Sequence, residues 1–221
     1  MPMIAPVRPL QGLLFDWDGT IVDSAQAMWL SYRYAYQRHL GIVFPRDAAE
    51  FRLLVPMRLA ESAARYGGEH AAAVAESYHW YYEHEGYKTG RVFPGVREAL
   101  ATLRGRGYRL GVASNKSWGR ISADIGHLGL DGVFEAFATS EDTPQRKPDP
   151  APLLKAAEKL GLAPALCAYI GDYQGDMVAA HAAGMVSVAV LWGGIFPAET
   201  LLAAQPAHVV ARPADLPALF P

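Results

Sequence analysis

Short apolar runs that alternate with helical patterns are the feature of this sequence that most restricts its fold. Runs too short for helices occur at residues 12–15, 108–113, 136–138, 168–170, 186–191 and 208–210. Apolar runs of this length, without a polar face, are typical of strands buried in a parallel sheet. Helical patterns lie between them at 96–104, 118–128, 150–160 and 176–182. The alternation predicts an α/β fold with a doubly wound, Rossmann-like parallel sheet.

Residues 24–90 interrupt this alternation, because they contain helical patterns and no convincing strand. Apolar and aromatic residues recur every four positions from Met28 to Leu40. Asp47 is a candidate N-cap for a second helix, and Pro56 is placed to open a third. We therefore expect a small helical cap domain, 24–90, inserted after the first strand of an α/β core made of 1–23 and 91–221. We interpret the many tyrosines of the insertion as packing residues.

Composition restricts the class of protein. Hydrophobic residues make up 51% of the 221 residues, which is typical of a chain with a sizeable core. The 20 Lys and Arg against 22 Asp and Glu give a net charge of −2, so no basic excess favours nucleic acid as a partner. Cys167 is the single cysteine, which excludes an intramolecular disulfide and a cysteine-based zinc site. Residues 177–198 carry no charge but contain glycines and a proline, so we expect no membrane partner and a cytoplasmic location.

Two aspartates, Asp16 and Asp18, follow the first apolar run. Ligands of open α/β sheets bind beyond the carboxyl ends of the strands, and residues i and i+2 of an extended segment point the same way. Gly19 permits a sharp change of backbone direction directly afterwards. Two carboxylates this close repel each other unless a cation or a shared proton offsets them. An EF-hand is excluded, because its glycine belongs at loop position six and a helix precedes the loop.

A second pair of carboxylates, Asp172 and Asp176, follows the run at 168–170. Asp176 also has an alternative interpretation as the N-cap of the following helix. Oxygen ligands that come from separate strands suit Mg²⁺, which commonly uses one or two carboxylates together with substrate phosphate and water. The sequence therefore indicates a magnesium site at the strand ends.

Two further motifs could bind phosphate. Ser114, Asn115 and Lys116 end an apolar run just before a helix, where a hydroxyl and backbone amides suit an anion. Lys147 stands immediately before Pro148, and it supplies a point positive charge. Considered singly, Ser114 and Asn115 are ordinary capping residues, and Lys147 is better interpreted as a solvated surface lysine.

Together, in this order and over nearly the whole chain, the four motifs resemble those of the haloacid dehalogenase-like superfamily of phosphohydrolases. More narrowly, the chain resembles the phosphoglycolate phosphatase-like branch, which has a helical cap at the position of residues 24–90. The resemblance implies a Mg²⁺-dependent phosphatase in which Asp16 is the nucleophile and Asp18 the general acid and base.

The same resemblance implies roles for the other motifs. Ser114 and the Asn115 amide would bind the phosphoryl group, and Lys147 would neutralise its charge. Asp172 would complete the Mg²⁺ site with the Asp16 carboxylate and the Asp18 backbone carbonyl, and Asp176 would support it. The substrate would be a small-molecule phosphate ester, and the chain would be a monomer or homodimer.

The sequence departs from the pattern of this branch in three places. Trp17 replaces a smaller apolar residue, and Tyr173 stands where a small polar residue is common. Residues 54–56 replace a loop that usually contains glycine, which puts the identity of the substrate in doubt. Arg52 and Arg58 flank this segment and are candidates for binding a substrate carboxylate, although solvated helix arginines are the simpler interpretation.

Two other functions remain open at this stage. A phosphosugar mutase of the same superfamily shares all the motif residues and differs only in how long the intermediate stays bound. A phospho-accepting regulatory domain also combines an aspartate, a metal and a lysine. Such domains lack a helical insertion after the first strand and carry the accepting aspartate later in the chain. Dehalogenation is less favoured, because that chemistry needs neither Mg²⁺ nor an acid at the position of Asp18.

Overall fold

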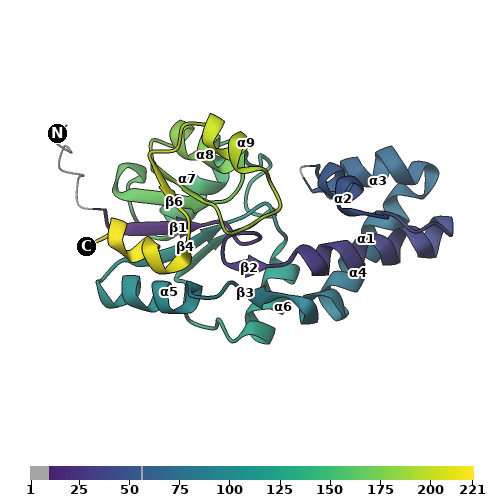
Figure 1. The fold of residues 1–221 in the computed structure, drawn as a ribbon, viewed down its shortest axis with the longest axis horizontal. Helices are drawn as coiled ribbons and strands as arrows, with labels where there is room; N and C mark the ends of the chain where they lie inside the picture. The colour runs from purple at the N-terminus through teal and green to yellow at the C-terminus, as the bar shows by residue number, and fades with distance from the viewer. Residues whose placement is uncertain (1–9, 56) are drawn as a thin grey trace. The chain divides into compact units, whose positions relative to one another are not determined.

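A computed structural model describes residues 10–55 and 57–221. Its core is a six-stranded parallel sheet in the order β5-β4-β1-β6-β7-β8 (Figure 1). The strands are β1 (Gly12–Phe15), β4 (Arg109–Ala113), β5 (Ala136–Ala138), β6 (Cys167–Gly171), β7 (Val186–Val190) and β8 (His208–Val210). Every strand expected from the apolar runs is present, and the doubly wound α/β prediction is confirmed.

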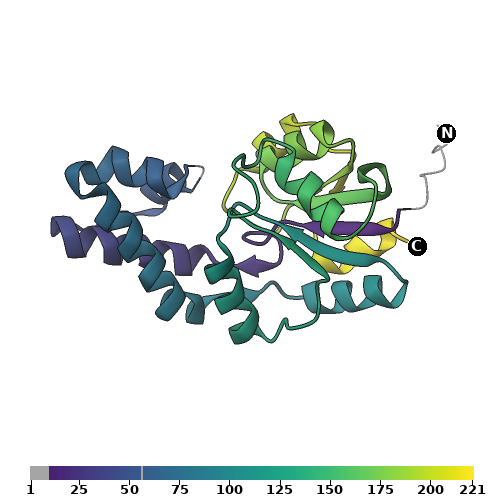
Figure 2. The ribbon, with the colours of Figure 1, turned by 180° about the vertical axis from the view of Figure 1, so that it is seen from behind.

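Helices cover both faces of this sheet. Figures 1 and 2 show α7 and α8 on one face, and α5 with the C-terminal 3₁₀ helix on the other. The helices that lie between the strands of the sheet along the chain, apart from the insertion, are α5 (Val96–Gly105), α6 (Trp118–Leu128), α7 (Ala151–Lys159), α8 (Gln174–Ala182) and α9 (Ala198–Ala203). The central strands are buried on both faces, which is why they are apolar throughout.

The order of the strands determines where polar residues gather. The chain runs from β1 outward through β4 and β5, and then returns to the other side of β1 with β6. The direction of winding therefore reverses around β1, and ligands of open α/β sheets bind at such a reversal, outside the carboxyl ends of the strands. Asp16, Ser114 and Asp172 each follow one of the three adjacent strands β1, β4 and β6.

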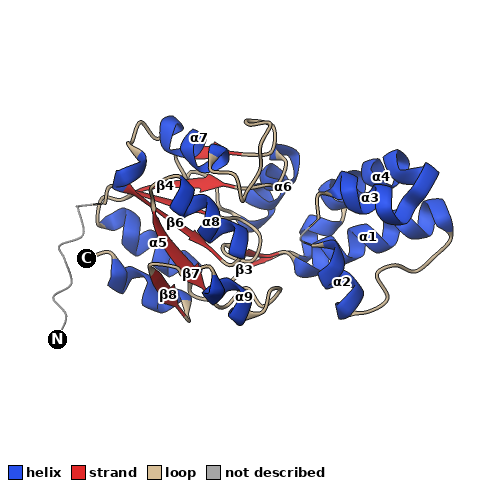
Figure 3. Ribbon diagram, turned by 90° about the horizontal axis from the view of Figure 1, so that it is seen from above, coloured by secondary structure: helices blue, strands red, loops and turns tan. Residues whose placement is uncertain are grey.

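The chain divides into two compact units, and the helical one comprises residues Ser24–Arg91 and Gly119–Leu128. Figure 3 shows its helices in blue. They are α1 (Ala25–Leu40), α2 (Ala48–Leu54), α3 (Leu59–Gly67), α4 (Ala71–His84) and most of α6. The insertion expected from the sequence ends at residue 90 and leaves 119–128 in the core, so the observed division differs from it. This part of α6 groups with the helices because its Asp124 is buried and accepts a hydrogen bond from the Tyr82 hydroxyl.

Local signals account for much of the helical unit. Asp47 caps α2 as expected, with its side chain accepting hydrogen bonds from the amides of Ala49 and Glu50. Pro56, expected to open the next helix, lies outside the described residues, and α3 begins at Leu59. The buried rings of Tyr32 and Tyr78 lie 4.6 Å apart, which agrees with our interpretation of the tyrosines as packing residues. Two short strands, β2 (Val22–Asp23) and β3 (Arg91–Val92), pair with each other and were not expected.

Within 10–55 and 57–221, none of the helices has the length and apolar character needed to cross a membrane.

Two adjacent leucines of α7 test how the sheet is stabilised. Leu153 is fully buried in a core cluster with Leu14 and Ala113, whereas Leu154 is 39% exposed. We expect Leu153→Ala to lower the free energy of unfolding by about 2–5 kcal/mol, because it removes buried methyl groups and leaves a cavity. Leu154→Ala, the matched control, should lower it by less than about 1 kcal/mol. Urea denaturation followed by circular dichroism measures both, and equal losses would contradict the assignment of the core.

Candidate active site

The candidate site is built on the carboxyl ends of β1, β4 and β6. The ladder between β1 and β6 extends into the site, because the Asp16 amide donates to the Ile170 carbonyl at 2.9 Å. The Ser114 amide likewise donates to the Ala138 carbonyl at 2.9 Å. The sheet backbone therefore determines where the chain enters the site at each of these strands.

Three carboxylates and one ammonium meet there. One oxygen each of Asp16, Asp172 and Asp176 lies within 4.8 Å of the others. The Nζ atom of Lys147 lies 2.8 Å from Asp16 Oδ1 and 2.8 Å from Asp176 Oδ1. The side chain of Lys147 is only 3% exposed, so the interpretation of this residue as a solvated surface lysine is wrong. Four residues from three separate motifs thus form one buried cluster, which we call the carboxylate cluster.

The carboxylate cluster carries an excess of negative charge. Burial, together with the carboxylates of Asp16 and Asp176, raises the pKa of Asp172 well above its ordinary value. Burial also raises the pKa of Asp176 to about 6, although the Lys147 ammonium acts in the opposite direction. Burial alone would lower the pKa of Lys147, but the carboxylates of Asp16 and Asp176 outweigh it and raise that pKa. Without another cation, the cluster therefore favours protonation of its acids.

The donor set fits a divalent cation. Three ionised carboxylates and one ammonium leave two negative charges, which one Mg²⁺ would balance. Asp176 Oδ1 is buried and has no hydrogen-bond partner among the described residues, since Lys147 lies at 2.8 Å but outside hydrogen-bonding geometry. An unsatisfied buried carboxylate oxygen is costly, and a metal ion is one group that satisfies it. All the ligand atoms are oxygens, the type that Mg²⁺ prefers.

Asp176 reaches the cluster from the first turn of α8. The helix begins at Gln174, so Asp176 is its third residue, and the expectation that Asp176 is the N-cap is wrong. Its Oδ2 atom accepts a hydrogen bond from the Tyr173 amide at 3.1 Å. The backbone at Gly171 passes so close to the Asp176 carboxylate that a Cβ there would collide with it.

Asp18 has a different partner from Asp16. Its Oδ1 atom lies 2.7 Å from Nζ of Lys116, whose side chain is 1% exposed, whereas that of Asp18 is 23% exposed. The Asp18 side chain is not part of the carboxylate cluster. The backbone turns between Asp18 and Thr20. Gly19, at this turn, has a φ of +79°, a conformation that favours glycine. The two aspartates therefore lie in distinct electrostatic surroundings, one beside each lysine.

The segment after β4 differs in part from the expected helix N-terminus with available amides. The carboxylate of Glu141 accepts the Trp118 amide at the start of α6, and the Lys116 amide donates to Ser114 Oγ at 3.3 Å. The Asn115 side chain accepts the Lys147 amide at 3.0 Å and donates to the Lys147 carbonyl at 3.2 Å. It thereby anchors the backbone of Lys147, a role that the sequence did not suggest.

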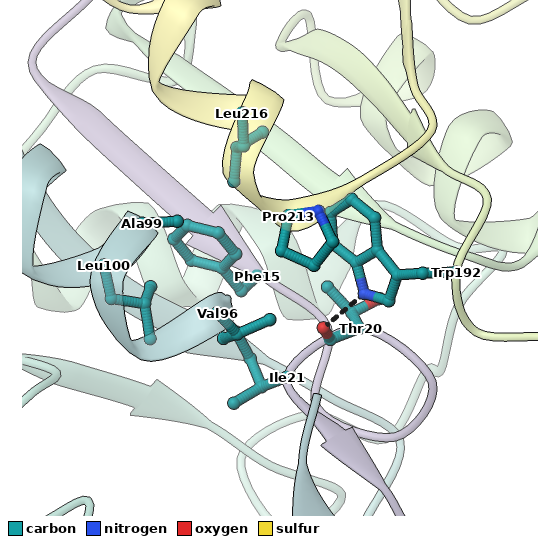
Figure 4. A pocket seen from close by; sticks show the side chains of 9 residues that line it. All are labelled: Phe15, Thr20, Ile21, Val96, Ala99, Leu100, Trp192, Pro213 and Leu216. Atoms are coloured by element: carbon teal, nitrogen blue, oxygen red, sulfur yellow. Dashed lines mark hydrogen bonds between the residues drawn. The ribbon is translucent and has the colours of Figure 1, made fainter. Parts of the chain in front are cut away.

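A loop after β7 supports the turn that carries Asp16 and Asp18. The Trp192 indole donates to the Thr20 carbonyl at 2.9 Å, beside an apolar pocket lined by Phe15, Ile21 and Leu216 (Figure 4). The Thr20 hydroxyl donates to Asp172 Oδ1 at 3.3 Å. At Gly193 a Cβ would collide with the Asp172 carboxylate and the Gly19 carbonyl. The loop thus lies directly against the backbone of the site.

Sequence reasoning gives no individual role to four residues that contact the site. Lys116 ends the motif that begins with Ser114 and Asn115, and Thr20 directly follows Gly19, so their positions are a usable signal. Tyr169 lies within an apolar run, and its hydroxyl reaches Lys147 Nζ at 2.8 Å. Trp192 follows the β7 run in a loop with no local pattern to mark it. For Tyr169 and Trp192, only the packing of distant segments reveals the contact.

The chain is similar to known hydrolases both in sequence and in structure. Residues 13–190 match the family described as haloacid dehalogenase-like hydrolase. A phosphoglycolate phosphatase from Haemophilus influenzae is 30% identical over 192 residues, covering 81% of this chain and 84% of that protein. One from Yersinia pestis is 29% identical over 216 residues, covering 95% and 92%. A haloacid dehalogenase-like family hydrolase from Streptococcus pneumoniae superposes with a TM-score of 0.85 at 25% identity, covering 96% and 99%.

The raised pKa values predict an unusual dependence of stability on pH. In the folded chain Asp176 keeps its proton up to about pH 6, whereas an unfolded aspartate releases it near pH 4. The folded state therefore binds more protons in this window, and Asp172 acts in the same direction. Without divalent cations, we expect Asp176 alone to increase the free energy of unfolding by about 1 kcal/mol as the pH falls from about 7 to about 5, and Asp172 to add to this increase. Urea denaturation in chelator at a series of pH values measures this.

The control is the same titration with saturating Mg²⁺ and with Asp176→Asn. Saturating Mg²⁺ should flatten the dependence, since a bound cation keeps the carboxylates ionised, and Asp176→Asn should weaken it, since asparagine does not titrate and only Asp172 remains. A metal-free chain that loses stability between about pH 7 and pH 5 would contradict the charge excess in the carboxylate cluster.

Proposed function

The chain belongs to the haloacid dehalogenase-like hydrolases, and we propose that it hydrolyses a small phosphoglycolate-like phosphate monoester through an aspartyl-phosphate intermediate on Asp16. One observation carries the proposal: Asp16 is ion-paired to the buried Lys147 within a cluster of three carboxylates that fits a divalent cation. Two relatives with the name phosphoglycolate phosphatase, matched over most of their length, support the choice of substrate class.

In the first step, a carboxylate oxygen of Asp16 attacks phosphorus, and the bond from phosphorus to the ester oxygen breaks. Asp18 supplies the proton that the departing alcohol oxygen takes. In the second step, Asp18 removes a proton from water, whose oxygen attacks phosphorus and breaks the bond to Asp16. Inorganic phosphate leaves, and both carboxylates return to their initial states. The two aspartates have separate lysine partners, so their electrostatic surroundings differ.

Charge at phosphorus is balanced by residues around the carboxylate cluster. Lys147 would neutralise the phosphoryl oxygens, and Ser114 with the Asn115 amide would bind them. The carboxylates of Asp16, Asp172 and Asp176, with the Asp18 backbone carbonyl, would hold Mg²⁺. When bound, the cation offsets negative charge on the transferring group and on these carboxylates.

Residues outside the carboxylate cluster would select the substrate. We propose that residues 24–90 act as the cap domain and that Arg52 or Arg58, both exposed, binds a substrate carboxylate. Replacement of the binding arginine by alanine would raise KM for phosphoglycolate and leave hydrolysis of a phosphate ester without a carboxylate unaffected; KM measured for Arg52→Ala and for Arg58→Ala identifies it.

The reaction itself is tested by removing the cation. With Mg²⁺, we expect release of inorganic phosphate from phosphoglycolate, and chelation should reduce the rate by about 100-fold or more. Phosphate assay and mass spectrometry of the organic product measure this, and restoration by added Mg²⁺ is the control. Undiminished turnover in verified metal-free protein would exclude the metal assignment. A phosphorylated isomer in place of free phosphate would indicate a mutase.

Replacement of Asp16 and replacement of Asp18 should impair different steps of the reaction. Asp16→Asn should form no phosphoenzyme, because the nucleophile is absent. Asp18→Asn should hydrolyse alkyl phosphates about 10²–10⁴-fold more slowly, since both proton transfers are lost. With an aryl phosphate, whose leaving group needs no proton, Asp18→Asn should give a burst of phenolate and accumulate phosphate on Asp16. Rapid-quench mass spectrometry detects this.

The matched control is Asp23→Asn, a change of the same chemistry at an exposed aspartate of the same segment, which should retain the wild-type rate. Label trapped on Asp16→Asn protein, or normal alkyl phosphate turnover by Asp18→Asn, would refute the assigned roles.

A further inference from the structure

We infer that Tyr169 is a positioning residue: its hydroxyl directs the Lys147 ammonium toward Asp16 and links it to the strand that precedes Ser114. The inference rests on the proposed function, because it assigns Tyr169 a part in the rate of that reaction. Tyr169 lies in the middle of β6 and is fully buried. Its hydroxyl lies 2.8 Å from Lys147 Nζ and 2.6 Å from the Ala113 carbonyl oxygen.

The direction of both hydrogen bonds follows from the chemistry of the groups. An ammonium only donates, so the Tyr169 oxygen accepts from Lys147. The single hydroxyl hydrogen is then left for the Ala113 carbonyl oxygen, which only accepts. The hydroxyl thus accepts one hydrogen bond and donates the other. A phenylalanine at this position would leave the Ala113 carbonyl and one N–H of Lys147 without this partner.

The other contacts of the ammonium do not connect it to β4. Its 2.8 Å contacts with Asp16 and Asp176 are ion pairs within the carboxylate cluster itself. They attract the ammonium to the cluster but give it no link to the strand that precedes Ser114. The hydrogen bond to Tyr169, which donates in turn to the Ala113 carbonyl, supplies that link.

Lys147 is thereby held at both ends by the segment that begins at the end of β4. Asn115 binds its backbone amide and carbonyl, and Ala113 binds its ammonium through Tyr169. Ser114, the proposed phosphoryl ligand, lies between these two residues. These contacts therefore fix the position of the Lys147 ammonium relative to Ser114. A catalytic group misplaced by about 1 Å can cost up to about 100-fold in rate.

The test compares Tyr169→Phe with a matched control, Tyr36→Phe. Tyr36 is also fully buried, and its hydroxyl donates to a backbone carbonyl, that of Ser62, at 3.0 Å, but its side chain has no lysine partner among the contacts described. We expect Tyr169→Phe to lower kcat by about 10-fold or more with KM changed less than about twofold. Tyr36→Phe should leave kcat at the wild-type value, and thermal unfolding should show similar small losses in both.

A double-mutant cycle tests whether Tyr169 acts through Lys147. In a Lys147→Ala background, assayed with an aryl phosphate, Tyr169→Phe should change kcat by less than about twofold, because the group it positions is gone. The same loss of kcat in both backgrounds, an unchanged kcat for Tyr169→Phe, or a rise in KM as its main effect would overturn the inference.

A readout independent of activity separates this inference from the proposed function. With lysine labelled by ¹⁵N at Nζ, the buried Lys147 ammonium should give a proton–nitrogen NMR signal, assigned by its absence from Lys147→Ala. Tyr169→Phe should shift or abolish this signal, and Tyr36→Phe should not. If the wild-type chain hydrolyses no phosphate monoester, the proposed function fails, and this signal alone decides whether Tyr169 holds Lys147. An unchanged signal in Tyr169→Phe would overturn the inference.

Discussion

The buried ion pairs of the Lys147 ammonium are the interaction on which the arrangement of the site depends. Three carboxylates, one after β1, one after β6 and one in α8, approach within 4.8 Å, and their mutual repulsion is large in a poorly solvated site. Lys147 lies 2.8 Å from two of them and offsets part of that repulsion. Because the single ammonium does not balance three carboxylates, an excess of negative charge remains in the cluster. This excess favours a divalent cation. Repulsion and its partial relief thus explain the position of the lysine, and they explain why the cluster fits a divalent cation.

Parallel strands make this concentration of charge possible. Strands that run in the same direction end at the same edge, so residues that follow β4, β1 and β6 become neighbours although they are far apart in the chain. Each strand supplies one function: Ser114 a hydroxyl, Asp16 a nucleophile candidate and Asp172 a metal ligand candidate. Hydrogen bonds between the buried strands fix the backbone from which these side chains extend. Side-chain contacts, such as that between Thr20 and Asp172, then hold the side chains themselves.

Two departures from the family pattern are accommodated by packing. The Trp17 side chain is fully buried and makes edge contacts with the rings of Phe134 and Phe137, at centroid distances of 5.9 and 6.4 Å. Tyr173 packs on Phe196, with ring centroids 4.6 Å apart, while its amide remains bonded to Asp176. In both places the larger side chain packs against aromatic rings.

The sequence by itself determined the strands and the residues at their ends, because an apolar run and the polar residue that closes it are local patterns. Asp16 and Asp172 were recognisable for that reason, whereas Lys147 gained a role only from the resemblance of the four motifs taken together. Only the tertiary structure decided that Asp18 pairs with Lys116, that Tyr169 bonds Lys147 and that residues 119–128 join the helical unit. Each of these depends on contacts between residues distant in the chain. From the sequence, a tyrosine in an apolar strand is interpreted as a core residue. Only the folded structure shows that a buried ammonium lies beside its hydroxyl.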